Sequence, residues 1–311
     1  MSTRDVAVAL VGPTASGKSA LAHSLAFEQL DHVEILAVDA MTVYRGMDLA
    51  TAKPTRTERS DVSYHLLDLV EPSEEFTVAQ FQRAARAAAA DVWGAGHKVL
   101  YVGGTGLYGR AVLDDLALPG QYPHVRTLLD ERAHDELPAL YAELEALDPL
   151  AASRMEATNA RRIVRALEVT LGAGRPFSSY GEGLTTYGPA RVVQVALQSD
   201  FEQLDLRIAA RFRSWMDQGL LEEVTALAAT PGGLSRTARQ AVGYRELLRH
   251  VEEGAELEAC VEDAIIQSRR LARRQRSWFL RDPRIEWFDE PELARARLLA
   301  VLNGPDGFVR D

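Results

Sequence analysis

One octapeptide near the start of the chain constrains the fold more than any other feature. Residues 12–19, GPTASGKS, match the pattern G-x-x-x-x-G-K-[ST] of a phosphate-binding loop. An apolar, β-branched run at residues 6–11 precedes the loop, and an Ala/Leu-rich stretch from Lys18 to about Leu30 follows it. The motif requires this order of strand, glycine turn and helix. The octapeptide therefore predicts an α/β fold and a ligand that carries a diphosphate or triphosphate.

The residue types in the loop suit that ligand. The glycines let the backbone curl so that successive N–H groups face phosphate oxygens, and the helix start adds the positive end of its dipole. Lys18 supplies a positive charge, and the Ser19 hydroxyl is a candidate Mg²⁺ ligand. A chance match in a glycine-rich turn is the alternative. The expected diphosphate-binding residues are Gly12, Thr14, Ala15, Ser16, Gly17, Lys18 and Ser19.

Further strand signals indicate a doubly wound parallel sheet. Residues 34–38, 98–102 and 191–197 are short apolar runs, and helical patterns separate them. In such sheets ligands bind at the carboxyl ends of the strands. The phosphate loop, Asp39 and the Gly-Gly-Thr of residues 103–105 all follow strands, so we expect three segments to converge on one crevice.

The middle of the chain predicts a separate helical insertion. Residues 115–171 have a helical pattern, and glycine and proline flank them. We expect an insertion domain at residues 115–190 and a phosphate-loop core at residues 1–114 and 191–311. Beyond residue 197 the pattern predicts helices only. The fold class is thus α/β, like P-loop NTPases, with a helical insertion.

Composition excludes several kinds of site. The chain has one cysteine, so an intramolecular disulfide and a cysteine-rich zinc site are excluded. Neither a secretory signal nor an apolar stretch of membrane-spanning length is visible, which predicts a soluble cytoplasmic protein without a membrane partner. The net charge of −10 argues weakly against nucleic acid, because phosphates repel an acidic surface.

The basic residues, however, are concentrated. Residues 268–284 hold seven arginines and a single acid. At helical spacing Arg269, Arg273 and Arg276 share one side, and Arg270, Arg274 and Arg281 share another, while Leu271 and Trp278 form the expected inward face. A second cluster comprises Arg161, Arg162 and Arg165. Arginines in such stripes pair well with a phosphate backbone. A solvated face with internal ion pairs is the alternative.

The acidic partner of a nucleotide-hydrolysing loop is missing. That partner is an Asp at the end of a neighbouring strand, where it helps to hold Mg²⁺. The strand at residues 98–102 ends in Gly-Gly-Thr instead. Asp39 follows a strand and remains a candidate for either a metal-sphere acid or a base. Asp68, in the segment HLLD, is another acid whose position the sequence does not define.

Several short motifs in order resemble the tRNA dimethylallyltransferase (isopentenyl-tRNA transferase) family. They are GPTASGKS at 12–19, VDAMTVYRGMD at 38–48, TAKP at 51–54, HLLD at 65–68, VGGTGLY at 102–108, RRIVRALE at 161–168, QAVGYR at 240–245 and RRQRSW at 273–278. The resemblance spans nearly the whole chain. Eukaryotic members carry a C-terminal zinc finger for which this chain lacks the cysteines, so the resemblance is to the bacterial type.

The resemblance implies a reaction and a set of roles. A dimethylallyl group would pass from dimethylallyl diphosphate to N6 of the adenine that follows the anticodon (position 37), with Mg²⁺ and the phosphate loop holding the leaving diphosphate. Asp39 matches the family's base, Thr105 lines the channel where adenine and donor meet, and Arg211 reaches the diphosphate. These three are the expected catalytic residues; a capping acid, a turn threonine and a solvated arginine are their alternatives.

The resemblance also implies a tRNA partner, contacted at the anticodon stem-loop by the insertion and the basic tract of an enzyme expected to be a monomer. Tyr244 beside Arg245 suggests stacking on an unpaired base, or else an ordinary packed tyrosine at a helix start. The expected tRNA-binding residues are Asp39, Ala40, Met41, Thr42, Thr105, Arg126, Arg161, Arg162, Arg165, Gln240, Gly243, Tyr244, Arg245, Arg273, Arg274, Trp278 and Arg281.

Three other functions share some of these features. A small-molecule kinase uses the same loop and fold but has no use for the arginine tract. A prenyltransferase acting on free adenine nucleotides needs neither the tract nor the insertion. A nucleotide switch or RNA-binding protein without catalysis leaves Asp39 and Thr105 without a role.

Overall fold

The computed structural model describes residues 5–29, 32–181, 183, 184, 186–304 and 309. Contacts between residues divide the chain into two compact units. The first unit comprises Met1–Asp115 with Gly188–Asp311, and the second comprises Leu116–Tyr187. Each unit has its own architecture and is considered by itself.

The first unit is built on a parallel sheet with strand order β3-β2-β4-β1-β5-β6, in which every neighbouring pair is parallel. The strands are β1 (Ala7–Val11), β2 (Val33–Ala37), β3 (Tyr64–His65), β4 (Lys98–Gly103), β5 (Val193–Leu197) and β6 (Ile285–Phe288). β1 lies between β4 and β5, so the loop that follows β1 emerges near the middle of the sheet.

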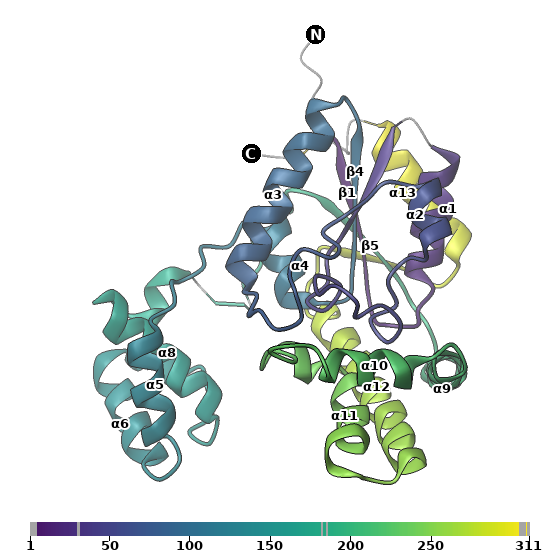
Figure 1. The fold of residues 1–311 in the computed structure, drawn as a ribbon. Helices are drawn as coiled ribbons and strands as arrows, with labels where there is room; N and C mark the ends of the chain where they lie inside the picture. Colours follow the sequence, from purple (N-terminus) through teal and green to yellow (C-terminus); the bar gives the residue numbers. More distant parts are fainter. Residues whose placement is uncertain (1–4, 30–31, 182, 185, 305–308, 310–311) are drawn as a thin grey trace. The chain divides into compact units, whose positions relative to one another are not determined.

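Helices cover both faces of this sheet, which confirms the doubly wound arrangement (Figure 1). Strand β1 alternates between the two layers: Val8 and Leu10 pack with α1 (Lys18–Glu28) and α13 (Pro291–Asn303). Ala7, Ala9 and Val11 belong to the larger core on the opposite face, under α3 (Val78–Gly94) and α4 (Gly106–Leu113). Because both faces are buried, the strands are apolar at almost every position.

Four helices of the first unit gather beyond one end of the sheet, below the strands in Figure 1. They are α9 (Phe201–Asp217), α10 (Leu220–Ala228), α11 (Tyr244–Glu253) and α12 (Leu257–Phe279). The remaining α-helix described in this unit is α2 (Arg56–Asp61), and a short 3₁₀ helix, η2, spans Ala238–Gln240. A hydrogen bond from α9 to the loop after β1 identifies this end of the sheet as the carboxyl end.

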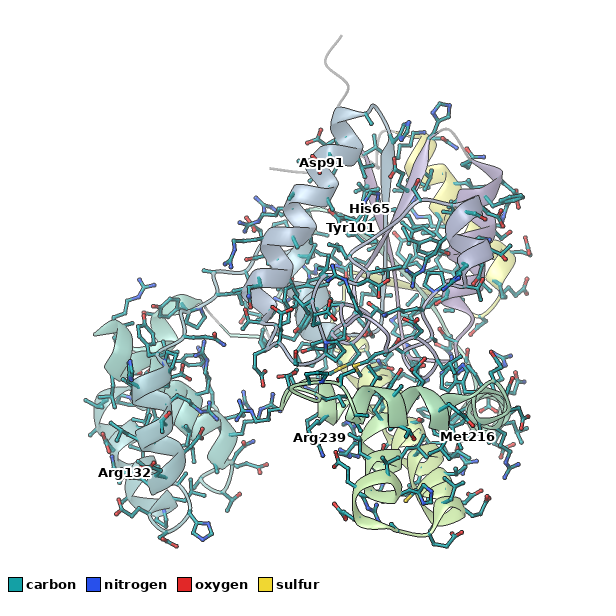
Figure 2. The ribbon with its side chains drawn as sticks, in the orientation of Figure 1. His65, Asp91, Tyr101, Arg132, Met216 and Arg239 are labelled. Atoms are coloured by element: carbon teal, nitrogen blue, oxygen red, sulfur yellow. The ribbon has the colours of Figure 1, made fainter. Side chains whose placement is uncertain are left out.

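The expectation that only helices follow residue 197 is wrong at the far edge of the sheet. Residues Ile285–Phe288 form β6 and pair in parallel with β5. The sequence IEWF consists largely of β-branched and aromatic residues that favour strands. The helical pattern around it obscured this short signal. β3, with two residues, was also not expected; His65 on β3 bonds Glu34 and lies among the strands in Figure 2.

The described residues of the second unit form helices and connecting loops, and no strand. It contains α5 (Pro123–Arg132), α6 (Leu137–Leu147), α7 (Pro149–Ala152) and α8 (Ala160–Ala173). A small core of its own includes Leu140, Leu144 and Leu167. Arg132, labelled in Figure 2, is the last residue of α5. It forms ion pairs with Glu136, which precedes α6, and with Glu143 on α6. In neither unit is a described helix long and apolar enough to cross a membrane.

Candidate active site

The loop between β1 and α1 presents unused hydrogen-bond donors. Gly12 and Gly17 have φ of 134° and 93°, and Ala15 also has a positive φ of 63°. Among the described residues, none accepts a hydrogen bond from the amides of Ala15, Ser16 or Gly17, and the buried Ser16 hydroxyl also has no partner. A buried hydroxyl without a hydrogen-bond partner, like that of Ser16, is rare. The loop therefore has the form of an anion-binding cradle.

Lys18 stands at the start of α1 with its charge poorly solvated. Its Nζ donates to the Pro13 carbonyl oxygen of the same loop at 3.1 Å. Burial, followed by the nearby positive charge of Arg211, lowers the pKa of Lys18 to about 8, although Asp39 opposes the shift. An anion in the cradle would restore a favourable partner to this ammonium group.

A second cation reaches the loop from α9. The Arg211 guanidinium donates from Nη2 to Thr14 Oγ1 at 2.7 Å and lies over the Trp215 ring at 4.7 Å. Burial lowers the pKa of Arg211 to about 10, and its Nε has no partner among the described residues. Two desolvated cations beside each other are unfavourable unless an anion lies between or beside them.

The ends of β2 and β4 bring Asp39 and Thr105 into contact. Thr105 Oγ1 donates to Asp39 Oδ2 at 3.0 Å, and the Met41 amide donates to Oδ1 at 2.8 Å. The close approach of the two strands depends on Gly103, because a Cβ at that position would lie 2.0 Å from the Val38 carbonyl oxygen. The carboxylate is thus fixed in orientation at the same edge of the sheet as the phosphate loop.

A small apolar cavity lies beneath this edge. Its walls come from the ends of β1, β2 and β4 and from the two helices above them. The lining residues are Val11, Val38, Tyr101, Gly103, Thr105, Gly109, Leu113 and Phe279. The crevice therefore combines an anion cradle, a fixed carboxylate and an apolar recess.

Residues 40–54, which follow Asp39, are held by a buried lysine. The Lys53 Nζ bonds the Tyr44 carbonyl oxygen at 2.6 Å, Asp48 at 2.7 Å and Asp68 at 2.6 Å. Arg59 also pairs with Asp68. Lys53 and Arg59 lower the pKa of Asp68 despite its partial burial, which acts in the opposite direction. Asp68 therefore stabilises residues 40–54. The structure thus defines the position of Asp68, which the sequence alone did not.

The base-stacking hypothesis for Tyr244 is wrong. Tyr244 is fully buried, and its hydroxyl donates to Glu223, which also accepts from the amides of Asp48 and Leu49. Gly243 allows this packing, since a Cβ there would lie 2.9 Å from the Ala50 Cβ. Tyr244 is instead a packed tyrosine at a helix start, which was the alternative interpretation. It can be buried because its hydroxyl has a buried acceptor within reach.

Other expected tRNA contacts differ in exposure. Gln240 is exposed, and Ala40 and Met41 are half-buried, but Thr42 is buried and cannot meet a large ligand without rearrangement. Arg245 pairs with Glu246 on its own helix. Neither restriction could be predicted from the sequence, since both depend on how residues 40–54 and α11 pack.

The arginines of α12 separate into paired and unpaired groups. Arg273 pairs with Asp205 on α9, and Arg276 lies over the Phe201 ring. The exposed residues Arg270, Arg274 and Arg281 make no ion pair within the described part of the chain. Because α12 ends at Phe279, the expectation that Arg281 shares a helical side with Arg270 and Arg274 is wrong.

The inward face of α12 also differs from expectation. Ala272 and Phe279 are buried, whereas Leu271 and Trp278 are half-buried at its margin. The Trp278 indole packs on the start of α4, where a Cβ at Gly106 would lie 2.2 Å from the ring. Helix α12 therefore rests directly on the segment that carries Thr105.

In the second unit a buried glutamate occupies two of the four arginines expected to bind tRNA. Glu168 on α8 accepts from the Tyr122 amide and pairs with Arg126 and Arg165. Arg161 and Arg162, in contrast, are exposed, and their guanidinium groups have no partner among the described residues. Only the latter two present free guanidinium groups on α8.

Sequence reasoning missed three residues that shape the crevice: Gln275, Lys53 and Glu223. Gln275 on α12 accepts a hydrogen bond from the Thr14 amide through Oε1 at 2.8 Å. Lys53 lies inside the motif TAKP and Gln275 inside RRQRSW, so these motifs could have pointed to both residues as parts of the site. Glu223 lies in none of the motifs, and no sequence feature pointed to it.

The sequence and the structure of the chain are both similar to those of known proteins. The family model described as IPP transferase matches residues 42–282. The tRNA dimethylallyltransferase of Salinispora arenicola is 48% identical over 91% of this chain and 82% of the relative, and that of Thermobifida fusca is 43% identical over 96% and 95%. The crystal structure of a tRNA isopentenylpyrophosphate transferase from Bacillus halodurans is similar with a TM-score of 0.69 and 31% identity, over 96% of this chain and 97% of that one.

Proposed function

The chain belongs to the IPP transferase family, and from that membership we propose that it transfers a dimethylallyl group from dimethylallyl diphosphate to N6 of the adenine following the anticodon in tRNA. The observation that carries the proposal is the composition of the crevice. An anion cradle with two desolvated cations lies at the same strand ends as a carboxylate fixed by Thr105.

The cradle suits the leaving group. The free amides of residues 15–17, with Lys18 and Arg211, stabilise the negative charge that develops on the diphosphate as the C1–O bond breaks. This use of the loop needs no bond cleavage between phosphates. It therefore agrees with the absence of a strand-end Asp after β4, whose last residue is Gly103.

Asp39 serves the nucleophile. The N6 lone pair forms a bond to C1 of the donor, the C1–O electron pair leaves with the diphosphate, and the N6 proton passes to Asp39. A poor nucleophile such as an exocyclic amine benefits from a base aimed at its proton. The hydrogen bonds from Thr105 and the Met41 amide fix the carboxylate orientation without using all of its acceptor sites.

The donor set fits Mg²⁺ in company with a diphosphate. Ser19 is exposed near the start of α1, and no three His, Cys, Asp or Glu side chains cluster as a metal site among the described residues. Mg²⁺ commonly binds through one or two protein oxygens, substrate phosphates and water. Ser19 would supply the protein oxygen, and the ion would supply charge neutralisation for the departing diphosphate.

The walls beside Thr105 and the exposed arginines suit the two substrates. The cavity beside Thr105 is apolar but only about the size of one water molecule, so its walls would have to move apart to receive the methyl groups of the donor. Arg270, Arg274 and Arg281 on the first unit, and Arg161 and Arg162 on the second, are free to meet tRNA phosphates. Activity as a monomer in the cytoplasm completes the proposal.

Mass spectrometry of nucleosides from tRNA incubated with enzyme, Mg²⁺ and dimethylallyl diphosphate tests the proposal directly. We expect N6-dimethylallyl adenosine at one position beside the anticodon. Parallel reactions with AMP, ADP and ATP as acceptors, and with ATP in place of dimethylallyl diphosphate, address the alternatives. Prenylation of free nucleotides alone, or phosphate transfer from ATP without prenylation, would overturn it.

A further inference from the structure

Gln275 connects the arginine-rich helix to the phosphate loop. Its Oε1 accepts from the Thr14 amide at 2.8 Å, and its Nε2 packs so closely on Gly104 that a Cβ there would lie 2.8 Å away. Gln275 stands on the inward side of α12, next to the buried residues Ala272 and Phe279. One side chain thus touches the ends of both β1 and β4.

Thr14 is held on two sides, and the two helices that hold it are joined. Arg211 of α9 bonds the Thr14 hydroxyl, and Gln275 of α12 bonds its amide. An ion pair between Arg273 and Asp205 links α12 to α9. Any shift of α12 along or about its axis therefore reaches the phosphate loop through a short chain of contacts.

Thr14 precedes the amides that are free. Its own N–H is used by Gln275, while those of Ala15, Ser16 and Gly17 have no acceptor within the described residues. The Gln275 bond therefore does not compete for the donors of the cradle. It fixes the backbone immediately before them, in a loop where Gly12, Ala15 and Gly17 take positive φ.

We propose that Gln275 is a positioning residue that couples tRNA binding to donor binding. tRNA phosphates on Arg270 and Arg274 hold α12 in place, Gln275 then holds Thr14, and the cradle is pre-organised for the diphosphate. Pre-organisation strengthens binding because less ordering remains to be paid for on association. The coupling is reciprocal, so the donor also tightens tRNA binding. The inference rests on the proposed function.

Calorimetry with a thiolo analogue of dimethylallyl diphosphate, whose C–S bond does not break, measures the coupling. The dissociation constant is determined with and without a saturating anticodon stem-loop RNA. For the wild-type enzyme we expect the RNA to tighten analogue binding by at least about fivefold. For Gln275→Ala we expect a ratio near one, with RNA affinity in the absence of analogue unchanged.

Two variants separate coupling from simple loss of structure. Gln275→Glu keeps an oxygen acceptor for the Thr14 amide, so its ratio should match the wild type even if added negative charge weakens analogue binding in both states. Gln267→Ala removes a half-buried glutamine of the same helix whose side chain bonds Asp263, and it should also keep the ratio. Thermal melting verifies that each variant is folded.

A measurement on the wild-type enzyme avoids substitution altogether. Addition of the stem-loop RNA should slow hydrogen exchange at the Thr14 amide, because Gln275 is held more firmly. An unchanged exchange rate, a wild-type ratio of one, or a wild-type ratio in Gln275→Ala would overturn the inference. If instead the wild-type enzyme forms no prenylated tRNA, the proposed function itself fails, so the two failures are distinguishable.

Discussion

The carboxyl edge of the sheet and the arginine surfaces are built on opposite principles. At the edge, Asp39, Lys18 and Arg211 are each oriented by at least one short contact and are partly or largely desolvated. The surfaces instead carry exposed arginines that all offer the same guanidinium group, namely Arg270, Arg274, Arg161 and Arg162. Single atoms should matter at the edge, whereas on the surfaces only the number of free cations should matter.

The largest effect is expected at Asp39. Asp39→Asn keeps the shape and can still accept from Thr105 Oγ1, but it cannot take the N6 proton. We expect the single-turnover rate with both substrates saturating to fall by roughly 10²- to 10⁴-fold, with smaller changes in KM. Thr105→Ser, which keeps the hydroxyl, is the matched control. A near-normal rate for Asp39→Asn would remove the base role, and recovery at high Mg²⁺ would assign Asp39 to the metal.

Lys18 should rank second. Lys18→Ala removes one charge-assisted contact to the diphosphate, which is worth roughly 1.5–3 kcal/mol. We therefore expect the dissociation constant of the donor, measured by calorimetry, to rise by roughly 10- to 150-fold. Lys98→Ala, a lysine at the opposite end of β4, controls for loss of positive charge. Equal donor affinity in Lys18→Ala and wild type would exclude Lys18 from the cradle.

The pH dependence of donor binding gives a smaller and sign-specific effect. The pKa of Lys18 is lowered to about 8 by burial and by Arg211, so the free enzyme loses this proton as the pH rises through that value. Donor affinity should be constant just below about pH 8 and should fall by up to tenfold per pH unit above it. Measurements stop before the pKa of Arg211, about 10, is reached.

Deprotonation of Lys18 affects the stability of the fold in the opposite direction to donor affinity. The unfolded chain keeps the Lys18 proton up to its ordinary pKa of 10.5, so it binds more protons than the folded enzyme above pH 8. The contribution of Lys18 to the free energy of unfolding should therefore rise with pH in this window. Lys18→Ala should lack both effects. A donor affinity in wild type that does not change across pH 8 would contradict the assignment.

The smallest effects belong to the surfaces, where free and paired arginines can be compared. Arg274→Ala combined with Arg281→Ala should reduce the slope of log affinity against log salt for tRNA by about 0.7–0.9 per lost phosphate contact. Arg126→Ala combined with Arg165→Ala should leave the slope unchanged and destabilise the second unit, because the buried Glu168 then loses both of its cationic partners. Equal slopes of tRNA affinity against salt in the two double variants would contradict the distinction between free and paired arginines.

The crevice was predictable from the sequence where its signals are local. The phosphate loop, Asp39 and Thr105 each follow a strand, and the rule that ligands bind at strand ends brings them together. The sheet followed from the same apolar runs, except for the short strands β3 and β6. Roles that depend on distant packing were not accessible: Tyr244 looked available for stacking until Glu223, on another helix, was seen to bond its hydroxyl.

Charge gave an incomplete prediction for a similar reason. A sequence shows which residues are cationic but not which of them are already paired. Arg165 and Arg161 are neighbours in one motif, yet only Arg165 meets the buried Glu168. The bond between Gln275 and Thr14 joins residues from opposite ends of the chain, and no periodicity or motif spacing encodes such a contact.

The central place of β1 has a consequence for the way the molecule is made. During synthesis β1 and the phosphate loop emerge before the segments that they contact, because β1 pairs with β4 and β5, and Thr14 bonds side chains of α9 and α12. Contacts of such long sequence separation slow folding and leave apolar strands exposed meanwhile. Nascent chains that stop before α12 should therefore carry the complete loop sequence and still not retain the donor, and they should depend on chaperones until α12 has emerged.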